Sequence, residues 1–477
     1  MEELVRWATS HGAALHPSVE VYNDPGTGNS FRASPAGPGV NPGETVVTCP
    51  MHLTLSYLNA TATPSPGFHH DAAAAAAAGP SGPLPPAFLA SVPPHVAGRF
   101  FLIHQYLLGE ASFWYPYIST LPRPEHLQSW ILPPLWPSDD VELLDDTNAH
   151  VAVAETKARL KAEFKHALAA LAAAAADARR YTRLLYHWAY CVFASRSFRP
   201  SLVIPAALRP TLALPEGCAV DDFSLLMPLL DIGNHSPTAA VAWDTGAGGA
   251  CALRTLDPYA PGAQVFNNYG AGKTNAELML AYGFCLPESP ALHNDYVHVQ
   301  KRGAAAAAAA AGGQAADAKR VDYLISLRPV ADPSSVAARA VRVLADVDGE
   351  TVLPPFRHVQ DAMVWDLVLA QTTAEQREAM LPVSVSVPAD AAAAGADLER
   401  LRKVLTGDVP AAFRPVLFQT VAIIQDKVLQ ELERLDQSEF EMDEAGATRN
   451  QRMAYHYRRQ CRRVLENVLE SMVMPED

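Results

Sequence analysis

The chain has 477 residues, of which 49% are hydrophobic, so it is long enough for two or more domains and can fill real cores. This composition excludes disorder along the whole chain. Lys and Arg number 37 against 51 Asp and Glu, which gives a formal net charge of −14. Such a surface repels phosphate backbones and favours basic partners, so we expect a globular protein that binds proteins rather than nucleic acid.

The N-terminus and the cysteines bear on the compartment. The first residues, MEELVRWATSHGAALHP, are acidic and contain no long apolar core, and later apolar runs are broken by charge and proline. We therefore expect neither a secretion signal nor a membrane span. The six cysteines are scattered, with no CxxC pair, which indicates thiols in a reducing compartment, the cytoplasm or the nucleus, and no metal site.

The first 303 residues mix strand and helix signals. Apolar runs bounded by turn residues predict strands at residues 46–56 (VVTCPMHLTLS) and 262–268 (GAQVFNN). Apolar residues at helical spacing predict helices at residues 102–118, 160–180 and 178–198.

Alanine tracts and helical patterns dominate the remainder. The glycine-flanked tract at residues 304–311 predicts a linker over residues 304–317, and the tract at 391–394 predicts an exposed loop. Two later stretches predict amphipathic helices that pack in a bundle, from apolar residues at Leu417, Val421, Ile424, Val428 and Leu432, and at Met453, Tyr457, Cys461, Val464, Val468 and Met472. Patterning does not reveal what a bundle binds, so a purely supporting role also fits.

Two polar turns stand out against this background. The run LLMPLLDIGNHSP ends an apolar stretch in Asp231 and then offers Gly233, Asn234, His235 and Ser236 in a row. The run GAQVFNNYGAGKTNAELMLAYGF likewise leads to Tyr269. A single turn of this kind commonly caps neighbouring backbone, but two in one chain favour a functional site.

These two segments resemble the paired signature segments of the SET domain. The forms DIGNHSP and YGAGKTNAELMLAYGF are similar to the subgroup that contains the Rubisco large-subunit and ribosomal-protein lysine methyltransferases and the actin histidine methyltransferase. Further segments fit this subgroup in order: GEASFWYPYISTLP, PPLWPSDDVELLDDT, WAYCVFASRSF and, near the C-terminus, TRNQRMAYHYRRQCRRVLENVL. The resemblance thus covers nearly the whole chain.

The resemblance implies an α+β fold. It divides the chain into a β-rich SET domain with a pseudoknot over residues 1–303, with a helical insertion at about 97–200. The linker at 304–317 would then lead to an all-α substrate-binding domain over residues 318–477. The sequence makes no prediction of the oligomeric state.

The resemblance also implies an S-adenosylmethionine-dependent protein-lysine N-methyltransferase that acts on a non-histone protein. Methyl transfer to an amine is an in-line displacement that needs positioning, exclusion of water and a neutral amine. Tyrosines suit the acceptor channel because they add aromatic walls and a hydroxyl without a full charge. Tyr269 matches the catalytic tyrosine, and Tyr282 matches a tyrosine that lines the channel.

Other positions match cofactor and acceptor contacts of the family. Asn234 and His235 match the pair that holds the cofactor, and Arg196 matches a residue near its carboxylate, which a guanidinium can bind by two hydrogen bonds. Phe284 matches a position against adenine, and Asp231 matches one that meets the acceptor through its backbone carbonyl.

The chain departs from the family pattern at two places. The N-terminal glycine loop reads DPGTGNSFRAS, in which either Gly26 and Gly28 form the expected pair or the motif begins at Gly28 with a serine as its second member. A plain surface turn is the alternative. Where close relatives have a further channel tyrosine, this chain has Trp243, which bears on substrate choice.

Two other functions remain open from the sequence. The first is a protein-histidine methyltransferase on the same scaffold, which would need a hydrogen-bond partner for the second ring nitrogen of the acceptor. The second is a catalytically silent SET scaffold that binds a protein, suggested by the irregular glycine loop and the alanine expansions.

Overall fold

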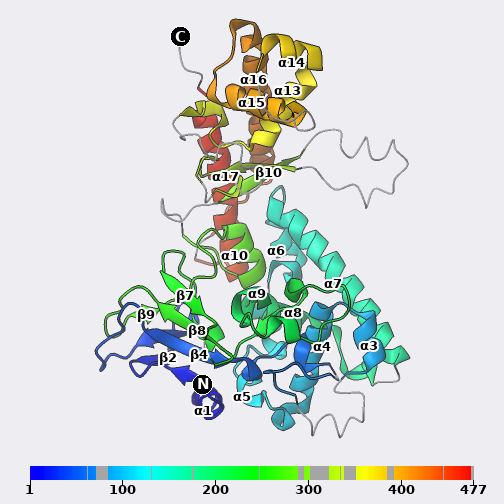
Figure 1. Ribbon diagram of the computed structural model, residues 1–477, viewed down its shortest axis with the longest axis vertical. Coiled ribbons are helices and arrows are strands. Elements are labelled where there is room, and N and C mark those ends of the chain that lie inside the picture. Colours follow the sequence, from blue (N-terminus) through cyan, green and yellow to red (C-terminus); the bar gives the residue numbers. More distant parts are fainter. Residues whose placement is uncertain are drawn as a thin grey trace. The chain divides into compact units, whose positions relative to one another are not determined.

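The computed structural model describes residues 1–61, 63–70, 84–129, 132–174, 177–246, 248–287, 295–300, 322–332, 335–337, 351–383, 392–443 and 445–473 (Figure 1). The chain forms two compact units. The first contains residues 1–136, 154–271 and 280–283, and the second contains residues 137–153, 272–279 and 284–477. The predicted linker at residues 304–317 lies outside the described residues.

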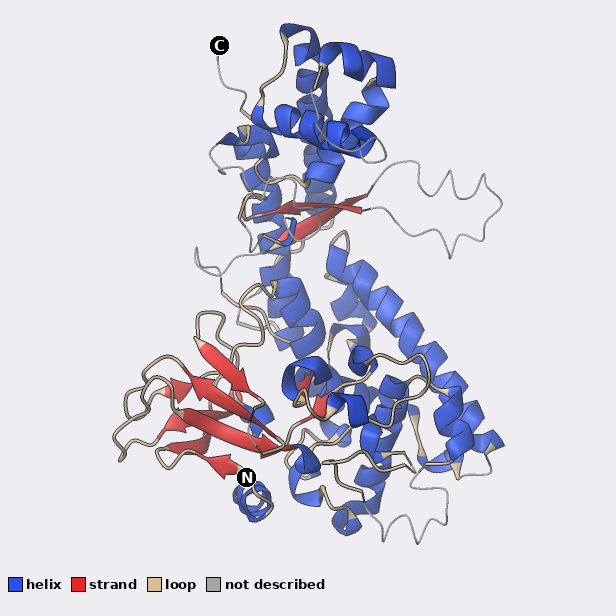
Figure 2. Ribbon diagram, in the orientation of Figure 1, coloured by secondary structure: helices blue, strands red, loops and turns tan. Residues whose placement is uncertain are grey.

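The first unit contains small antiparallel sheets. One has the strand order β1-β4-β8-β7, another has the order β2-β3-β9, and a third pairs β5 with β6. The strands are β1 (Ala14–Leu15), β2 (Val19–Asp24), β3 (Gly28–Ala33), β4 (Thr45–Pro50), β5 (Ser197–Phe198), β6 (Leu225–Leu226), β7 (Val241–Asp244), β8 (Ala250–Thr255) and β9 (Gln264–Val265). Within this unit most of the strands gather on one side and most of the helices on the other (Figure 2).

The helices of the first unit include three longer ones, α4, α7 and α8. Their bounds, with those of the shorter helices, are α1 (Glu2–Ser10), α3 (Pro86–Ser91), α4 (Pro94–Leu108), α5 (Tyr115–Ile118), α7 (Asn148–Ala173, whose residues from 154 onward lie in this unit), α8 (Arg183–Arg196), α9 (Pro200–Val203) and the end of α10 (Asn275–Tyr282). The prediction of one helix over residues 102–118 is wrong in its middle. Gly109 ends α4 with a φ of +57°, a conformation that breaks the helix before α5.

The second unit is mainly helical and also contains a hairpin of β10 (Tyr296–Gln300) and β11 (Asp322–Ser326). Its helices are α6 (Ser138–Glu142), the start of α10, α13 (Asp361–Gln371), α14 (Ala374–Met380), α15 (Ala392–Thr406), α16 (Arg414–Gln437) and α17 (Arg449–Ser471). The predicted α+β fold with a helical C-terminal region is confirmed. The all-α description omitted β11, and the loop predicted at residues 391–394 is wrong because α15 begins at Ala392.

Helices α16 and α17 bear out most of the two predicted amphipathic patterns, because most of their apolar stripes are buried. Leu432 is only half-buried, and Met472 lies just past the end of α17. The guanidinium of Arg458 on α17 ties several parts of this unit together. It donates to the Leu435 carbonyl at 2.9 Å and to Ser438 Oγ at 2.8 Å, and it also reaches the Leu143 carbonyl at 3.4 Å. Among the described residues, every helix is either too short or too polar to cross a membrane.

Candidate active site

The two polar turns predicted from the sequence lie against each other in the first unit. His235 and Asn267 form a parallel β-bridge. The Asn267 N–H donates to the Asn234 carbonyl at 2.8 Å, and the Ser236 N–H donates to the Asn267 carbonyl at 2.9 Å. Backbone hydrogen bonds therefore fix the two segments in register.

Tyr269 lies at the centre of this junction. Its hydroxyl donates to the Gly233 carbonyl at 3.0 Å, and its backbone N–H donates to His235 Nδ1 at 3.1 Å. Its ring stacks on the rings of His235 and Tyr282, with centroid distances of 5.0 and 4.8 Å. Burial raises the pKa of Tyr269 above its ordinary value, so the hydroxyl stays protonated at neutral pH.

These bonds set the hydrogen-bonding roles of both side chains. The Tyr269 hydroxyl donates its hydrogen bond to the Gly233 carbonyl. Toward any other group it can therefore act only as an acceptor, through its oxygen lone pairs. Because His235 Nδ1 accepts from the Tyr269 backbone, the neutral imidazole carries its proton on Nε2. The junction thus presents an oxygen acceptor and an N–H donor close together.

Asp231 is the buried charge of this region. Its side chain is 1% exposed, and Oδ2 accepts from the Tyr117 hydroxyl at 2.8 Å and from Arg196 at 3.3 Å. Burial raises the pKa of the Asp231 carboxyl, while the Arg196 charge and the Tyr117 hydrogen bond favour its ionised form. Arg196 at the end of α8 thus has a carboxylate partner in the protein itself.

The backbone before Asp231 is strained. Leu229 is fully buried and has a φ of +73°, in the left-handed region that non-glycine residues rarely adopt. Such strain costs about 1–3 kcal/mol and persists only where the surroundings over-determine it. It leads directly into the turn of residues Leu230–Ile232 that carries Asp231.

Trp243 reaches the same junction from β7. Its indole N–H donates to Asn267 Oδ1 at 3.1 Å, and the same oxygen accepts from the Asn268 backbone at 2.8 Å. The Trp243 ring also packs edge-on against Phe198, with 5.5 Å between centroids. Trp243 is therefore bonded to the residue that forms the bridge with His235.

The glycine loop is the turn between β2 and β3. Asp24 Oδ1 closes it by accepting from the backbones of Gly26 and Thr27 at 2.9 Å each. Gly28 has a φ of +78°, whereas Gly26 is outside the left-handed region. Asn234 Nδ2 donates to Thr27 Oγ1 at 2.9 Å, so the loop lies beside the first polar turn.

Comparison with solved structures identifies the fold of the chain. The SET domain of LSMT bound to lysine and AdoHcy matches with a TM-score of 0.60 and 15% identity, over 99% of this chain and 90% of that one. Rubisco LSMT bound to AdoMet matches with a TM-score of 0.59 and 16% identity, over 99% and 91%. The chain has the SET-domain fold of Rubisco LSMT.

The sequence also matches curated lysine N-methyltransferases. The ribosomal lysine N-methyltransferase set10 of Schizosaccharomyces pombe is 28% identical over 319 residues, which are 64% of this chain and 50% of that protein. The protein-lysine N-methyltransferase EFM1 of Saccharomyces cerevisiae is 24% identical over 208 residues, 36% of this chain and 33% of that protein. The chain thus spans half or less of the length of these relatives. No protein-family model matches it.

In this SET fold, most of the residues singled out from the sequence lie in the first unit. Hydrogen bonds link Tyr269 to His235, Asp231 to Arg196, and Asn234 through Thr27 to the glycine loop. Ring stacking links Tyr269 to Tyr282. Phe284 belongs to the second unit. The roles of all these residues toward cofactor and acceptor stay predictions.

The sequence assigned no role to three residues at or beside the junction. Tyr117 comes from α5, Thr27 from the glycine loop and Asn267 from the second polar turn. All three lie inside segments that the resemblance to the SET family had already marked, so the sequence pointed to the segments but not to these residues. Their individual roles depend on partners far away in the sequence.

Two polar atoms at the junction bear on cofactor binding. Asn267 Nδ2 and Asp231 Oδ1 are buried and have no hydrogen-bond partner among the described residues. A buried polar atom left unpaired costs about 1–3 kcal/mol. The pair therefore fits a ligand that carries both hydrogen-bond acceptors and positive charge, as S-adenosylmethionine does.

Proposed function

We propose that the chain is an S-adenosylmethionine-dependent protein-lysine N-methyltransferase that acts on a non-histone protein. The observation that carries the proposal is the environment of Tyr269, whose hydroxyl bonds the Gly233 carbonyl while its ring stacks on His235 and Tyr282. The SET fold and the lysine methyltransferase names of the curated relatives support it.

The residues at the junction would hold the cofactor as follows. Asn234, His235 and the unpaired Asn267 amide would bind its polar groups, and the turn with Gly26 and Gly28 would approach it with bare backbone. Arg196 would attract its carboxylate, in addition to its bond to the protein's own carboxylate. S-adenosylmethionine, when bound, supplies a methyl group on a positively charged sulfur.

The tyrosines would prepare the acceptor amine. The stacked rings of Tyr269 and Tyr282 form an apolar wall, which disfavours the charged ammonium and so lowers the pKa of a lysine beside them. The Tyr269 oxygen can accept a hydrogen bond from the amine because the hydroxyl hydrogen points to the Gly233 carbonyl. The amine would thereby be aimed with its lone pair free for attack.

The proposal extends to the whole protein. Residues 318–477 would recognise the protein substrate, Asp231 and Trp243 would border the acceptor side, and the enzyme would work in the cytoplasm or the nucleus. The helical character of the second unit supports the first of these roles. The bonds of Trp243 to Asn267 and of Asp231 to Tyr117 support the second.

Labelling of a lysate tests the proposal. The purified chain is incubated with methyl-labelled S-adenosylmethionine and a lysate, and the modified residue is mapped by mass spectrometry. We expect label on a lysine of a non-histone protein. Label on histidine would establish the histidine methyltransferase instead, and no label together with no cofactor binding by calorimetry would favour the silent scaffold.

A further inference from the structure

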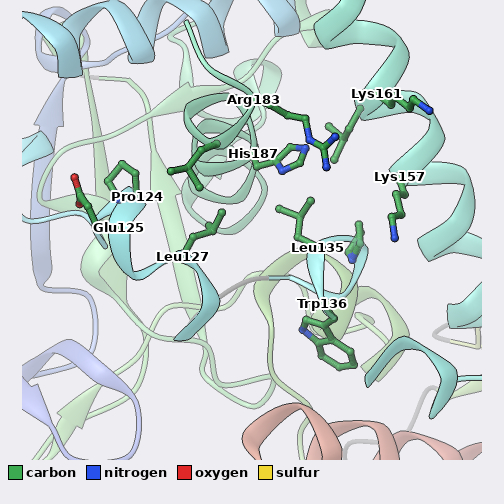
Figure 3. A pocket seen from close by; sticks show the side chains of 12 residues that line it. Pro124, Glu125, Leu127, Leu135, Trp136, Lys157, Lys161, Arg183 and His187 are labelled. Carbon is green, nitrogen blue, oxygen red and sulfur yellow. The ribbon is translucent and has the colours of Figure 1, made fainter. Parts of the chain in front are cut away.

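A cavity lies in the first unit, and none of its lining residues belongs to the Tyr269 junction. It has a volume of about 770 Å³ and lies between α7, α8 and two short stretches, Pro124–Leu127 and Pro134–Trp136. Figure 3 shows Lys157 and Lys161 on one helix and Arg183 and His187 on another, with Leu135 between the two helices and Trp136 below it. The volume falls in the range of about 300–1,000 Å³ that ligand pockets occupy.

One wall of this cavity is strongly basic. Lys157, Lys161 and Arg183 are all exposed, and none of them has an ion pair or a hydrogen bond with another described residue. Glu163, also on α7, is by contrast paired with Arg99 of α4 at 2.7 Å. Three unpaired cations in one cavity stand out in a chain with a net charge of −14.

The remaining surface of the cavity is largely apolar. Leu135, Trp136 and Leu160 line it, and Leu184 is 49% exposed beside Arg183. An exposed leucine beside unpaired cations fits a partner that brings both an apolar side chain and negative charge.

His187 adds hydrogen-bonding capacity without charge. Burial, together with the charge of Arg183, lowers the pKa of His187 to about 4. The imidazole is therefore neutral at pH 7 and offers one donor and one acceptor. The positive charge of the wall comes from the two lysines and the arginine.

The spacing of the cations matches an extended peptide. Lys157 and Lys161 are four residues apart on α7, so they are separated by about 6 Å along the helix axis at 1.5 Å per residue. Alternate side chains of an extended chain lie about 6.6 Å apart on one face, and the residue between them points the other way. Two acidic side chains on one face could thus meet the two lysines.

We propose that this cavity is a docking site for an extended acidic–apolar–acidic segment of a partner protein. The acidic side chains pair with Lys157 and Lys161, and the apolar side chain between them packs on the Leu135 and Leu184 surface. Arg183 on α8 adds a third positive charge to the cavity beside Lys157 and Lys161. The docking site stands on its own lining and does not rest on the proposed methyl transfer.

Glu125 limits how far the acidic run extends. It lies across the cavity from the lysines in Figure 3, and it accepts a hydrogen bond from Tyr106 at 3.0 Å. The Glu125 backbone N–H and the Tyr106 hydroxyl lower the pKa of the Glu125 carboxyl, so it is negative at pH 7. A further acidic residue there is repelled, which favours a short acidic motif over a long acidic tail.

A peptide array tests the docking site with the full chain. The array holds seven-residue peptides with Asp or Glu at positions three and five, and position four is varied among apolar and polar residues. Control peptides have neutral or basic residues at positions three and five, or a scrambled sequence. We expect the wild-type chain to select acidic–apolar–acidic peptides, with binding that weakens as salt rises.

Three variants separate this cavity from general charge effects. Lys161→Glu is expected to weaken peptide binding about tenfold, because a favourable pair becomes a repulsive one. Lys165→Glu changes the net charge equally on the same helix, but Lys165 does not line the cavity, so it should leave binding within about twofold. Leu184→Asn should weaken binding about fivefold by removing apolar contact without changing charge.

Three results would overturn the proposal. The first is selection of peptides without the spaced acidic residues, or of none at all. The second is equal binding by the wild-type, Lys161→Glu and Leu184→Asn chains, each checked for folding by circular dichroism. The third is a Lys161-dependent affinity for single-stranded RNA with no affinity for the peptides, which would make the cavity a nucleic-acid site.

Discussion

Asp231 shows how a single residue of this site is held. A carboxylate that is 1% exposed needs donors to offset its lost hydration, and it finds them in the Tyr117 hydroxyl and in Arg196. Burial raises the pKa of Tyr117 well above its ordinary value, so this hydroxyl remains a donor at all physiological pH values. Leu229, two residues before Asp231, has a strained backbone, which indicates that the fold holds Asp231 in place at a cost in conformational free energy.

Replacing Tyr117 measures what this donor contributes. We expect Tyr117→Phe to lower the free energy of unfolding by about 1–3 kcal/mol, because the buried Asp231 oxygen loses a partner. Urea unfolding followed by circular dichroism checks it. Tyr115→Phe is the matched control, since the Tyr115 hydroxyl on the same short helix has no hydrogen bond with another described residue. Equal stability of the two variants would contradict this account of Asp231.

At the scale of elements, three helices of the first unit are joined by one carboxylate. Glu163 on α7 accepts from Arg99 on α4 at 2.7 Å and from Tyr186 on α8 at 2.8 Å, and it also contacts His95 at 3.1 Å. Burial alone would raise the pKa of the Glu163 carboxyl, but these partners outweigh it and hold the pKa at about 2. The cluster therefore clamps the helical side of the unit.

This clamp predicts an acid-sensitive stability. The folded pKa of Glu163, about 2, lies below the ordinary value of 4.5, so its stabilisation is complete above about pH 4.5 and is lost as the pH falls toward 2. The difference corresponds to about 3 kcal/mol. Glu163→Gln should lower the free energy of unfolding by about this amount at pH 7 and by little near pH 2. A deficit that does not change with pH would mean that Glu163 acts only through packing.

The hairpin between β2 and β3 gives a second prediction at this scale. Gly28→Ala should cost about 1 kcal/mol, because alanine is disfavoured at a φ of +78°. Gly26→Ala should cost less, since Gly26 is outside that region and its added Cβ would lie 3.4 Å from Asp24 Oδ1. Thermal unfolding compares the two. A larger loss for Gly26→Ala would reverse the assignment of the conformationally demanding glycine.

Sequence patterns located the long elements better than their ends. The stripes of α16 and α17 were readable because a single face is buried along each helix. The start of α8 depends on the Thr182 side chain, which caps the Leu185 N–H, and not on the apolar pattern. The hairpin of β10 and β11 was missed because its two strands pair across a long intervening segment.

The same limit applies to the site. The two polar turns were visible as runs of polar residues after apolar ones, and the resemblance placed Tyr269 and Tyr282 on the chain. That Tyr117 supports Asp231 could not be predicted, because the two residues are 114 positions apart and only the fold brings them together. The ion pair of Arg196 with Asp231 could not be predicted either, because the two residues are 35 positions apart.

At the scale of the whole molecule, an overall negative charge coexists with one locally basic cavity. The net charge of −14 favours a basic protein substrate, whereas the basic cavity on α7 and α8 favours an acidic segment. The two preferences are compatible because salt screens charges beyond about 8 Å, so a local cluster acts on its own neighbourhood. A partner with a basic surface and one short acidic segment would satisfy both.

The net charge predicts the salt dependence of turnover. For a basic substrate, the apparent KM should rise roughly threefold between about 50 and 300 mM salt, with kcat little changed, because screening weakens long-range attraction. Methyl incorporation measured over a range of substrate concentrations checks this. A KM that falls with salt would indicate a substrate that the negative surface repels.

The central claim, that Tyr269 serves methyl transfer to lysine, is tested most directly by one comparison. Cofactor affinity by calorimetry and methyl transfer to the mapped substrate are measured together for the wild-type, Tyr269→Phe and Tyr115→Phe chains. We expect Tyr269→Phe to bind S-adenosylmethionine with nearly unchanged affinity and to transfer methyl about 100-fold more slowly or worse, while Tyr115→Phe matches the wild type. Unchanged transfer by the folded Tyr269→Phe chain would contradict the claim.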